Sequence, residues 1–185
     1  MAIPASTGVL RTKIEDMKIG DYIKVDYLRS SLDSVINSTS STECVITGTT
    51  SGSAPQCFFY MIKVARGVLV SDRVVANTIT WDNMNTGKHI QGRPTTLYGI
   101  SGAVRSLTGG VAYADANGNS STTDLGFGAF PTNNEWDKYI VNFPTDKIQS
   151  GKTLDDVFNW SGVYTWTQDT PTITIGTNVT RIRRG

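Results

Sequence analysis

Apolar and polar residues alternate along several segments in the first part of the chain. From Ile23 to Tyr27 every second residue is apolar, which is typical of a half-buried strand. Three more strands are predicted where apolar, β-branched and aromatic residues gather: 43–47, 58–65 and 68–71. Arg66-Gly67 has the composition of a hairpin turn, and residues 30–42, mostly polar, are predicted to be an exposed loop. The front half is therefore expected to be antiparallel β-structure.

Three short helices are predicted further along, and each begins at a threonine that can cap it: Thr80, Thr132 and Thr153. The first ends at Gly87. In the second, Glu135 completes a capping box, and one face carries apolar side chains: Trp136, Tyr139 and Ile140. Short strands are predicted between and after these helices: 104–107, 163–166, 172–175 and 179–182.

These elements predict a β-rich α+β fold with short helices and long loops, and an all-β sandwich is the alternative. Residues 1–18, with one helical turn at 13–17, are expected to form an N-terminal arm. Residues 19–185 are expected to form a single domain with a β-rich front half, 19–75. Gly92 to Pro94 is predicted to interrupt regular structure.

Composition narrows the class of partner. The chain has 185 residues, 38% of them hydrophobic, and a net charge of +1. That charge argues against nucleic acid or an anionic membrane, because both select clustered basic side chains. The one basic cluster is interpreted as a solvated strand end or a contact between subunits: Arg181, Arg183 and Arg184. The sequence has neither an apolar run long enough for membrane insertion nor a secretory signal pattern, so synthesis in a cytoplasm is expected.

The two cysteines, Cys44 and Cys57, flank a loop rich in Ser, Thr and Gly. A cross-strand disulfide is geometrically feasible, but two buried free thiols are favoured because synthesis is expected in a reducing compartment. A zinc site is not expected, because the single histidine and two cysteines lack ligand spacing.

Candidate catalytic groups have structural explanations in the sequence. His89 is followed by no nucleophile motif and is interpreted as a structural residue. Four acidic residues could supply a glycosidase pair: Glu135, Asp137, Asp155 and Asp156. However, the capping box explains Glu135, and favourable charge at a helix start explains the Asp pair. We therefore expect no enzymatic activity and no catalytic residues.

A polar stretch at 115–128 is the best metal candidate, since hard oxygen ligands recur in it: Asp115, Asn117, Asn119 and Asp124. The spacing does not fit a helix–loop–helix calcium site, because Gly118 comes too early and Gly126 occupies the last ligand position. An ordinary polar loop is favoured. No cofactor is expected, with calcium as the alternative.

Four segments in order resemble motifs of the C-type lectin fold of the formylglycine-generating-enzyme type. They are the helix openings Asn77-Thr78-Ile79-Thr80-Trp81-Asp82 and Pro131-Thr132-Asn133-Asn134-Glu135-Trp136, then Asp156-Val157-Phe158-Asn159-Trp160 and Val179-Thr180-Arg181-Ile182-Arg183-Arg184-Gly185. The resemblance spans about residues 70–185 and implies a lectin-like domain with its motifs in 76–185. The enzymes of that family need a late cysteine pair, which this sequence lacks, so their oxidase activity is not implied.

The amino-acid sequences of four stretches are similar to those of structural proteins of bacteriophages that infect Gram-positive bacteria: 67–73, 79–82, 105–110 and 134–140. This resemblance implies a virion protein of a tail, baseplate or fibre, assembled in the host cytoplasm with other virion proteins. The lectin-like family usually continues beyond its Arg-Gly stretch into further closing strands. Either this domain closes its sheet differently, or a neighbouring subunit supplies the missing strand, which would make a homo-oligomer obligatory. The alternatives to a virion protein are an enzyme that degrades cell-wall sugar and a free-standing bacterial lectin-like binding module.

Host attachment through a cell-surface glycan would use the loops 30–42 and 111–129. Aromatic rings stack on sugars while amide and carboxylate groups bind hydroxyls, which nominates six residues: Tyr113, Asp115, Asn117, Asn119, Asp124 and Phe127. The four tryptophans are expected to be structural anchors: Trp81, Trp136, Trp160 and Trp166. Of these, Trp136, Trp160 and Trp166 are predicted to share one interior.

Overall fold

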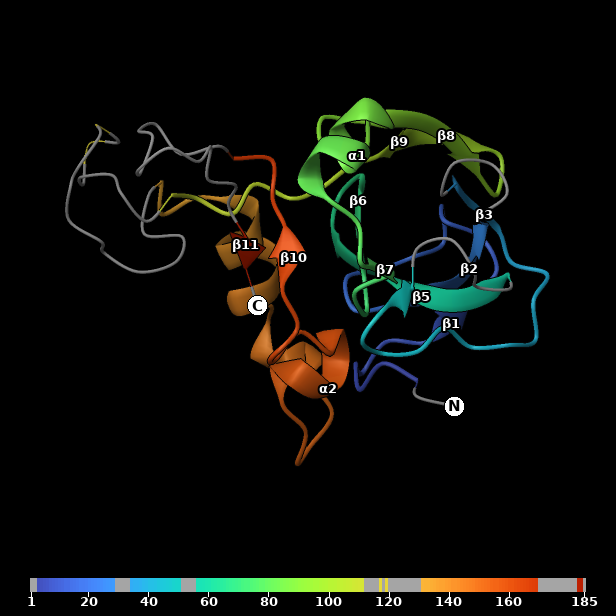
Figure 1. The fold of residues 1–185 in the computed structure, drawn as a ribbon. Coiled ribbons are helices and arrows are strands. Elements are labelled where there is room, and N and C mark those ends of the chain that lie inside the picture. Colours follow the sequence, from blue (N-terminus) through green and yellow to red (C-terminus); the bar gives the residue numbers. More distant parts are fainter. Residues whose placement is uncertain are drawn as a thin grey trace.

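The computed structural model describes residues 3–28, 34–50, 56–111, 117, 119, 131–169 and 183–184. Strand accounts for 31% of the structure and helix for 15%, and the helices are short. This content confirms the predicted β-rich α+β class. Figure 1 shows a sheet on one side of the molecule and the C-terminal helical segments on the other.

The main sheet has five strands: β1 (Leu10–Arg11), β2 (Tyr22–Leu28), β3 (Ser34–Asn37), β5 (Cys57–Ala65) and β6 (Val68–Ser71). Their order is β1-β2-β5-β6, and β3 also pairs with β2. The β2–β5 and β5–β6 pairs are antiparallel. The predicted turn at Arg66-Gly67 joins β5 to β6, where Gly67 has a φ of 73° that favours glycine.

Three two-stranded ladders complete the described β-structure. They are β4 (Thr49–Thr50) with β7 (Ala76–Asn77), β8 (Arg93–Leu97) with β9 (Ile100–Val104), and β10 (Thr165–Trp166) with β11 (Arg183–Arg184). The β8–β9 hairpin turns at Tyr98-Gly99, both of which have positive φ. Figure 1 shows this hairpin beside α1, above the main sheet.

Each face of the main sheet contributes to a separate hydrophobic cluster, because β5 has apolar side chains on both sides. Phe58, Tyr60 and Ile62 belong to the first cluster, together with residues of the C-terminal helical segments. Cys57 and Phe59 belong to the second, which residues of β2 and the β8–β9 hairpin complete. The central strand is therefore buried on both faces.

The helical segments are α1 (Trp81–Thr86), a π-helix η1 (Asp137–Val141), a 3₁₀ turn η2 (Thr145–Lys147) and α2 (Leu154–Phe158). Two of the predicted caps are confirmed. The Thr80 hydroxyl accepts from the Asn83 backbone N–H, and Gly87 ends the helix. Thr153 and Asp156 form a complete capping box at α2.

The capping box predicted at Thr132 is wrong. The Asn134 Oδ1 atom instead accepts from the Asp137 backbone N–H at 2.9 Å, and the Glu135 side chain pairs with Arg105. Asn134 is as good a cap as threonine, and the local sequence does not decide between them. The predicted apolar face is present: Trp136 and Ile140 are buried in the first cluster, with Tyr139 packed against it.

Several predicted elements differ in the structure because tertiary pairing overrides local pattern. Residues 34–37 of the predicted loop form β3, since they pair with β2. The strand predicted at 43–47 is reduced to one bridge, Glu43 to Phe58. Arg93 and Pro94, predicted to interrupt regular structure, instead begin β8. Of the strand predicted at 104–107, only Val104 lies in a strand, as the last residue of β9. Residues 13–17 form a turn rather than a helix.

The N-terminal arm lies against the C-terminal half of the chain. The Ala5 backbone N–H donates to the Asp156 carbonyl at 3.1 Å, and that of Thr7 donates to the Lys147 carbonyl at 2.8 Å. Ala5 is also part of the first hydrophobic cluster. The arm thus joins the two ends of the fold.

Cys44 and Cys57 form a disulfide, so the favoured interpretation as free thiols is wrong. The Cys44 backbone N–H donates to the Phe58 carbonyl at 2.8 Å, which holds the two cysteines on neighbouring backbone segments. Both cysteines are buried in the second cluster. The disulfide therefore closes the loop 45–56 against β5.

Two of the four tryptophans pack against each other, and the other two donate to backbone carbonyls. Trp136 and Trp160 pack edge to face, with ring centroids 6.2 Å apart. Trp166 is half-buried and its Nε1 atom donates to the Ile79 carbonyl at 2.9 Å. The Trp81 Nε1 atom donates to the Thr167 carbonyl at 3.0 Å. The shared interior expected for three tryptophans thus joins Trp136 and Trp160, while Trp166 ties β10 to the start of α1.

Candidate functional site

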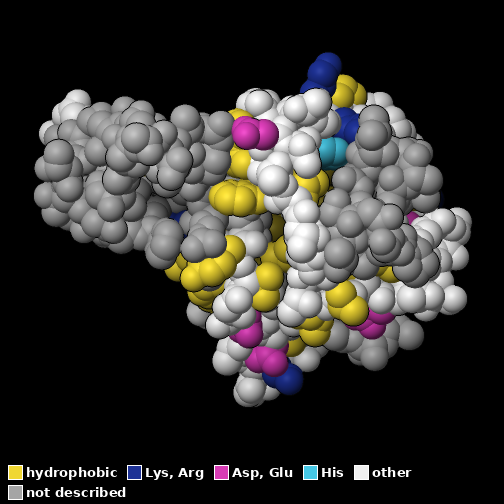
Figure 2. Space-filling model, in the orientation of Figure 1, with side chains coloured by type: hydrophobic (Ala, Val, Ile, Leu, Met, Phe, Trp, Pro, Cys, Tyr) yellow, Lys and Arg dark blue, Asp and Glu magenta, His cyan; other side chains and the backbone are white. Residues whose placement is uncertain are grey.

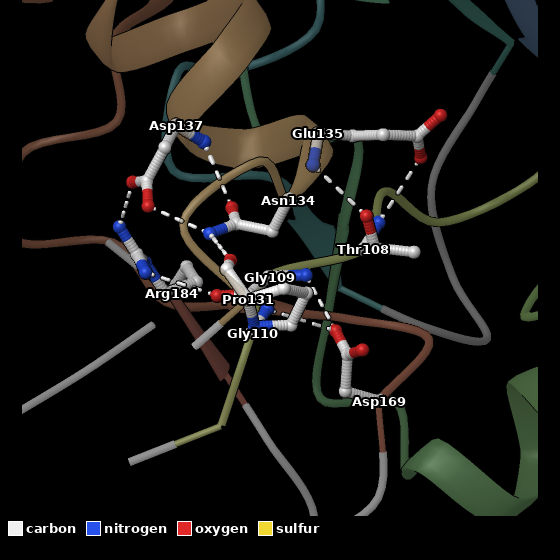
Figure 3. A network of polar contacts seen from close by, with 9 residues as sticks. All are labelled: Thr108, Gly109, Gly110, Pro131, Asn134, Glu135, Asp137, Asp169 and Arg184. Carbon is white, nitrogen blue, oxygen red and sulfur yellow. Dashed lines mark hydrogen bonds and ion pairs between the residues drawn. The ribbon is translucent and has the colours of Figure 1, made fainter. Parts of the chain in front are cut away.

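A polar network joins four segments that are distant in sequence: 105–110, 131–137, 169 and 184 (Figure 3). At its centre, Asn134 caps the π-helix. Its Nδ2 atom donates to the Pro131 carbonyl at 2.9 Å and to the Asp137 carboxylate at 2.7 Å. Asn134 is buried, so these bonds satisfy its amide group without water.

Glu135, one of the nominated catalytic carboxylates, forms a two-pronged ion pair with Arg105. Both Glu135 oxygens lie 2.5 Å from guanidinium nitrogens. The carboxylate also accepts from the Thr108 backbone N–H at 3.1 Å. Arg105 and this backbone donor lower the pKa of Glu135 below its usual value of 4.5, although partial burial opposes the change. A carboxyl group held in this way stays ionised and is a poor general acid at neutral pH.

Asp137 is held by Arg184. The guanidinium donates to the Asp137 carboxylate at 2.5 Å and to the Gly109 carbonyl at 2.9 Å. It lies 5.9 Å from the centre of the Trp136 ring, within cation–π range. The Arg184 side chain is only 10% exposed, so this part of the predicted basic cluster is packed inside the fold instead of forming a solvated strand end.

The Asp169 carboxylate accepts from two successive backbone donors, the N–H groups of Gly109 and Gly110. A Cβ atom at Gly109 would lie 2.4 Å from the Thr167 side chain, so the segment approaches closely only because this residue is glycine. The N–H groups of Gly109 and Gly110 thus bind a carboxylate from the chain itself. The sequence gives no signal for this contact, which joins residues 60 positions apart.

The remaining nominated carboxylates bind backbone groups near their own helix. Asp156 is the acidic member of the α2 capping box, as predicted from the sequence. The Asp155 carboxylate accepts from the Ser161 backbone N–H at 2.7 Å. All four carboxylates are therefore engaged, either with nearby backbone groups or in ion pairs that connect segments.

A second charged network was not predicted. The Arg73 side chain is 0% exposed and contacts the Asp72 carboxylate at 2.6 Å and Glu43 at 2.9 Å. It also donates to the Cys44 carbonyl at 2.6 Å. Burial lowers the pKa of Arg73, but its bonds to Asp72 and Glu43 outweigh this and raise it above its usual value. Arg73 thus stays charged and fixes the disulfide-bearing segment.

Asp26 is another buried acid that the alternating pattern of β2 had placed on a polar face. It is 0% exposed. Its Oδ2 atom accepts from the Thr39 and Ser40 N–H groups at 2.7 and 2.8 Å, and from Gln56 Nε2 at 2.7 Å. Its Oδ1 atom accepts from the Ser38 hydroxyl at 2.6 Å. This single carboxylate organises much of the described part of the loop predicted to be exposed.

A cavity of about 450 Å³ lies between the main sheet and the C-terminal segments. Its walls come from β5 and β6, from the 74–79 segment, from residues 104–107 and from residues 160–166. Apolar side chains dominate the walls, including Leu69, Trp136, Trp160 and Trp166. Figure 2 shows hydrophobic side chains gathered in the middle of this face of the molecule. The volume is within the usual range for small-molecule sites.

The nominated glycan and calcium residues fall mostly outside the described part of the chain. Asn117 and Asn119 are described, and both are exposed. The other four lie outside the described residues: Tyr113, Asp115, Asp124 and Phe127. Within the described residues, no three His, Cys, Asp or Glu side chains are grouped so that they could hold a metal ion. Those residues also contain no helix that is long and apolar enough to cross a membrane.

No protein-family model, curated protein or solved structure significantly matches the chain.

Proposed function

We propose that this protein is a non-catalytic structural component of a bacteriophage tail, baseplate or fibre, assembled in the host cytoplasm. The sequence motifs that resemble phage structural proteins support this proposal. The same proposal takes residues 76–185 as the lectin-like part and other virion proteins, including copies of this chain, as its partners. Binding of a host cell-surface glycan through the 111–129 loop is the finer part of the proposal.

The observation that carries the non-catalytic part of the proposal is that all four nominated carboxylates are engaged in hydrogen bonds or ion pairs within the fold. A glycosidase needs one carboxyl group with a raised pKa and a second that faces the substrate. Glu135 has the opposite property, because Arg105 and the Thr108 N–H group lower its pKa. Asp137 is bound to Arg184, and Asp156 to its own helix cap. These interactions favour a binding or structural role over sugar hydrolysis.

The assembly role is tested by locating the protein in particles. Antibodies against the purified chain are used for immunogold labelling of phage particles released from the bacterium that carries the gene. We expect gold at the tail, and the chain should sediment with infectious particles on a density gradient. Detection only in the soluble fraction, with unlabelled particles, would contradict the proposal.

The glycan part and the enzyme alternative are separated by two assays on purified host cell walls. In a pull-down, the chain should bind walls, and its Tyr113→Ala and Phe127→Ala variants should bind less. A matched control is Tyr164→Ala, an exposed aromatic outside the nominated loop. In zymography on the same walls, no clearing is expected. Clearing would favour the enzyme, and equal binding by all variants would refute the nominated loop.

A further inference from the structure

Strand β9 (Ile100–Val104) is an exposed strand at the edge of its hairpin. Among the strands that the structure describes, β9 pairs only with β8. Its first four residues are exposed, including Ile100 at 39%. Monomeric proteins usually protect such an edge with a charged side chain, a proline or a bulge. β8 carries Arg93 and Pro94, whereas β9 carries no such residue and keeps its register without a bulge.

The backbone groups of Ser101 and Ala103 point away from β8. In an antiparallel ladder, hydrogen-bonded and non-hydrogen-bonded pairs of residues alternate. The two-residue turn closes on the pair of Leu97 and Ile100, which is the hydrogen-bonded kind. Ser101 and Ala103 are therefore in non-hydrogen-bonded pairs, and Ala103 stands opposite Pro94, which has no N–H to donate. Each of these two residues thus directs an N–H and a C=O group outward, where no described strand pairs with β9.

Gly102, at the centre of β9, is not explained by the fold of a single chain. Its φ is not positive, so the backbone conformation does not require glycine. A Cβ atom at this position would meet no atom within 4 Å, so packing does not require glycine either. Glycine inside a strand weakens it, because glycine loses more conformational freedom on folding than other residues. A glycine in a strand often marks a place where another backbone approaches closely.

We propose that β9 is the interface between two copies of this chain, which pair antiparallel about a two-fold axis at Gly102. In this register Gly102 lies opposite the partner's Gly102, and Ile100 lies opposite the partner's Val104. Ser101 lies opposite the partner's Ala103, and these two residues exchange their outward N–H···O bonds. The edge is self-complementary, with small residues at the centre and branched apolar residues at both ends. Since β9 contains no charged residue, no like charges meet across the axis.

The contact between two isolated copies is weak, because so short a strand buries less than the roughly 1,200 Å² of a standard interface. A dissociation constant of about 0.1 mM is expected. Arg105, which follows β9, is paired with Glu135, so the nearest charge after the strand is balanced. The inference rests on the part of the proposed function that takes copies of this chain as partners. Its test uses the purified chain, so a failure here leaves the particle-labelling result unaffected.

Charge exchange at Gly102 tests the pairing and its register. Sedimentation equilibrium from about 10 μM to about 1 mM at low salt should show a monomer–dimer equilibrium for the parent chain. Gly102→Lys and Gly102→Glu should each associate at least about tenfold more weakly, because like charges would face each other across the axis. An equimolar mixture of the two should recover association, because opposite charges then meet. Ser150→Lys is the matched control, since it adds the same charge at an exposed residue outside β9 and should associate like the parent.

Each outcome of this experiment decides a part of the proposal. A parent chain that stays monomeric throughout would overturn it and leave the edge to a strand of another protein. Equal association of the parent and both Gly102 variants would place the contact elsewhere and overturn it. A mixture that associates no better than the single variants would overturn the register about Gly102. Thermal unfolding of each variant checks that it is folded, which the open space around Gly102 predicts.

Backbone hydrogen exchange, followed residue by residue by NMR, tests which groups form the new bonds. The N–H groups of Ser101 and Ala103 should exchange about two- to fivefold more slowly at 1 mM than at 10 μM chain, because the dimer protects them. The N–H group of Gly102, already bonded to β8 in the single chain, should change little. Unchanged exchange at Ser101 and Ala103 in a chain that dimerises would overturn β9 as the interface.

Discussion

The buried carboxylate of Asp26 offers the sharpest test of the fold, because its replacement by asparagine changes charge with almost no change in shape. An asparagine could keep its oxygen at the Oδ2 position, where three donors converge from Thr39, Ser40 and Gln56. Its NH₂ group would then face the Ser38 hydroxyl, which can rotate to accept. The hydrogen bonds would survive but lose their charge assistance.

The expected loss in free energy of unfolding follows from the number of hydrogen bonds that Asp26 accepts. A hydrogen bond to a charged group contributes about 1.5–3 kcal/mol and a neutral one about 1 kcal/mol. Four such bonds predict that Asp26→Asn lowers the free energy of unfolding by about 3 kcal/mol. Asp26→Ala should cost more than about 5 kcal/mol, because it also leaves buried N–H groups without acceptors.

Urea unfolding followed by tryptophan fluorescence measures both variants against the parent chain. The matched control is Asp16→Asn, which removes an exposed carboxylate and should change stability by less than about 0.5 kcal/mol. A loss below about 1 kcal/mol for Asp26→Asn, or a loss equal to that of the control, would refute the account of Asp26 as an organising charge.

The pH dependence of stability, compared between the parent chain and Asp26→Asn, tests the direction of the Asp26 pKa shift. Burial by itself raises the pKa of Asp26, but bonds from Ser38, Thr39 and Gln56 outweigh it, so the pKa lies below its usual 3.8. The folded state therefore binds fewer protons than the unfolded state, and stability rises with pH in this range. The contribution is complete above the unfolded pKa of about 4 and is lost as pH falls through the folded value. The difference between parent and Asp26→Asn should shrink in acid, and a difference constant from neutral pH to pH 2 would contradict this.

Three further predictions test other contacts. Reduction of the disulfide, or a Cys44→Ser/Cys57→Ser double variant, should lower the free energy of unfolding by about 2–3 kcal/mol, since it frees a loop closed by residues 13 positions apart; an unchanged urea midpoint would contradict this. Thr153→Ala should cost about 1 kcal/mol by loss of the α2 capping box, while Thr132→Ala should cost almost nothing because Asn134 caps the other helix; equal losses in thermal unfolding would reverse the assignment. Arg184→Ala should cost about 2 kcal/mol and Arg184→Lys about half of that, because lysine keeps the charge near Asp137 but not the paired donors; equal stability of the two variants by urea unfolding would show that only charge matters.

The parts of the fold that could be predicted depend on neighbours close in sequence. The β5–β6 hairpin follows from two apolar runs and a Gly turn, and the α2 cap from Thr153 and Asp156 at the right spacing. At residues 132–135 the same rule failed, because Glu135 pairs with Arg105, which lies 30 positions away. Local patterns do not reveal which distant cation competes for a carboxylate.

The candidate site was less predictable still. The alternation of β2 indicated that Asp26 faces water, yet the backbone of residues 39–40 surrounds it. Nothing in the sequence indicated that Arg73 is buried, since a charged residue after a strand usually lies at the surface. The cavity combines side chains from at least four segments, so no single stretch of sequence could indicate it.

The two-sided burial of β5 has a consequence for synthesis on the ribosome. Phe58, Tyr60 and Ile62 emerge long before Val157 and Phe158, which pack in the same cluster. Until those later residues are made, one broad apolar face of the nascent sheet stays uncovered. A ribosome pause or a premature stop between β5 and α2 would therefore leave a fragment with exposed apolar surface that is prone to aggregate. Cellular quality control of this chain should act mainly on products that end before α2.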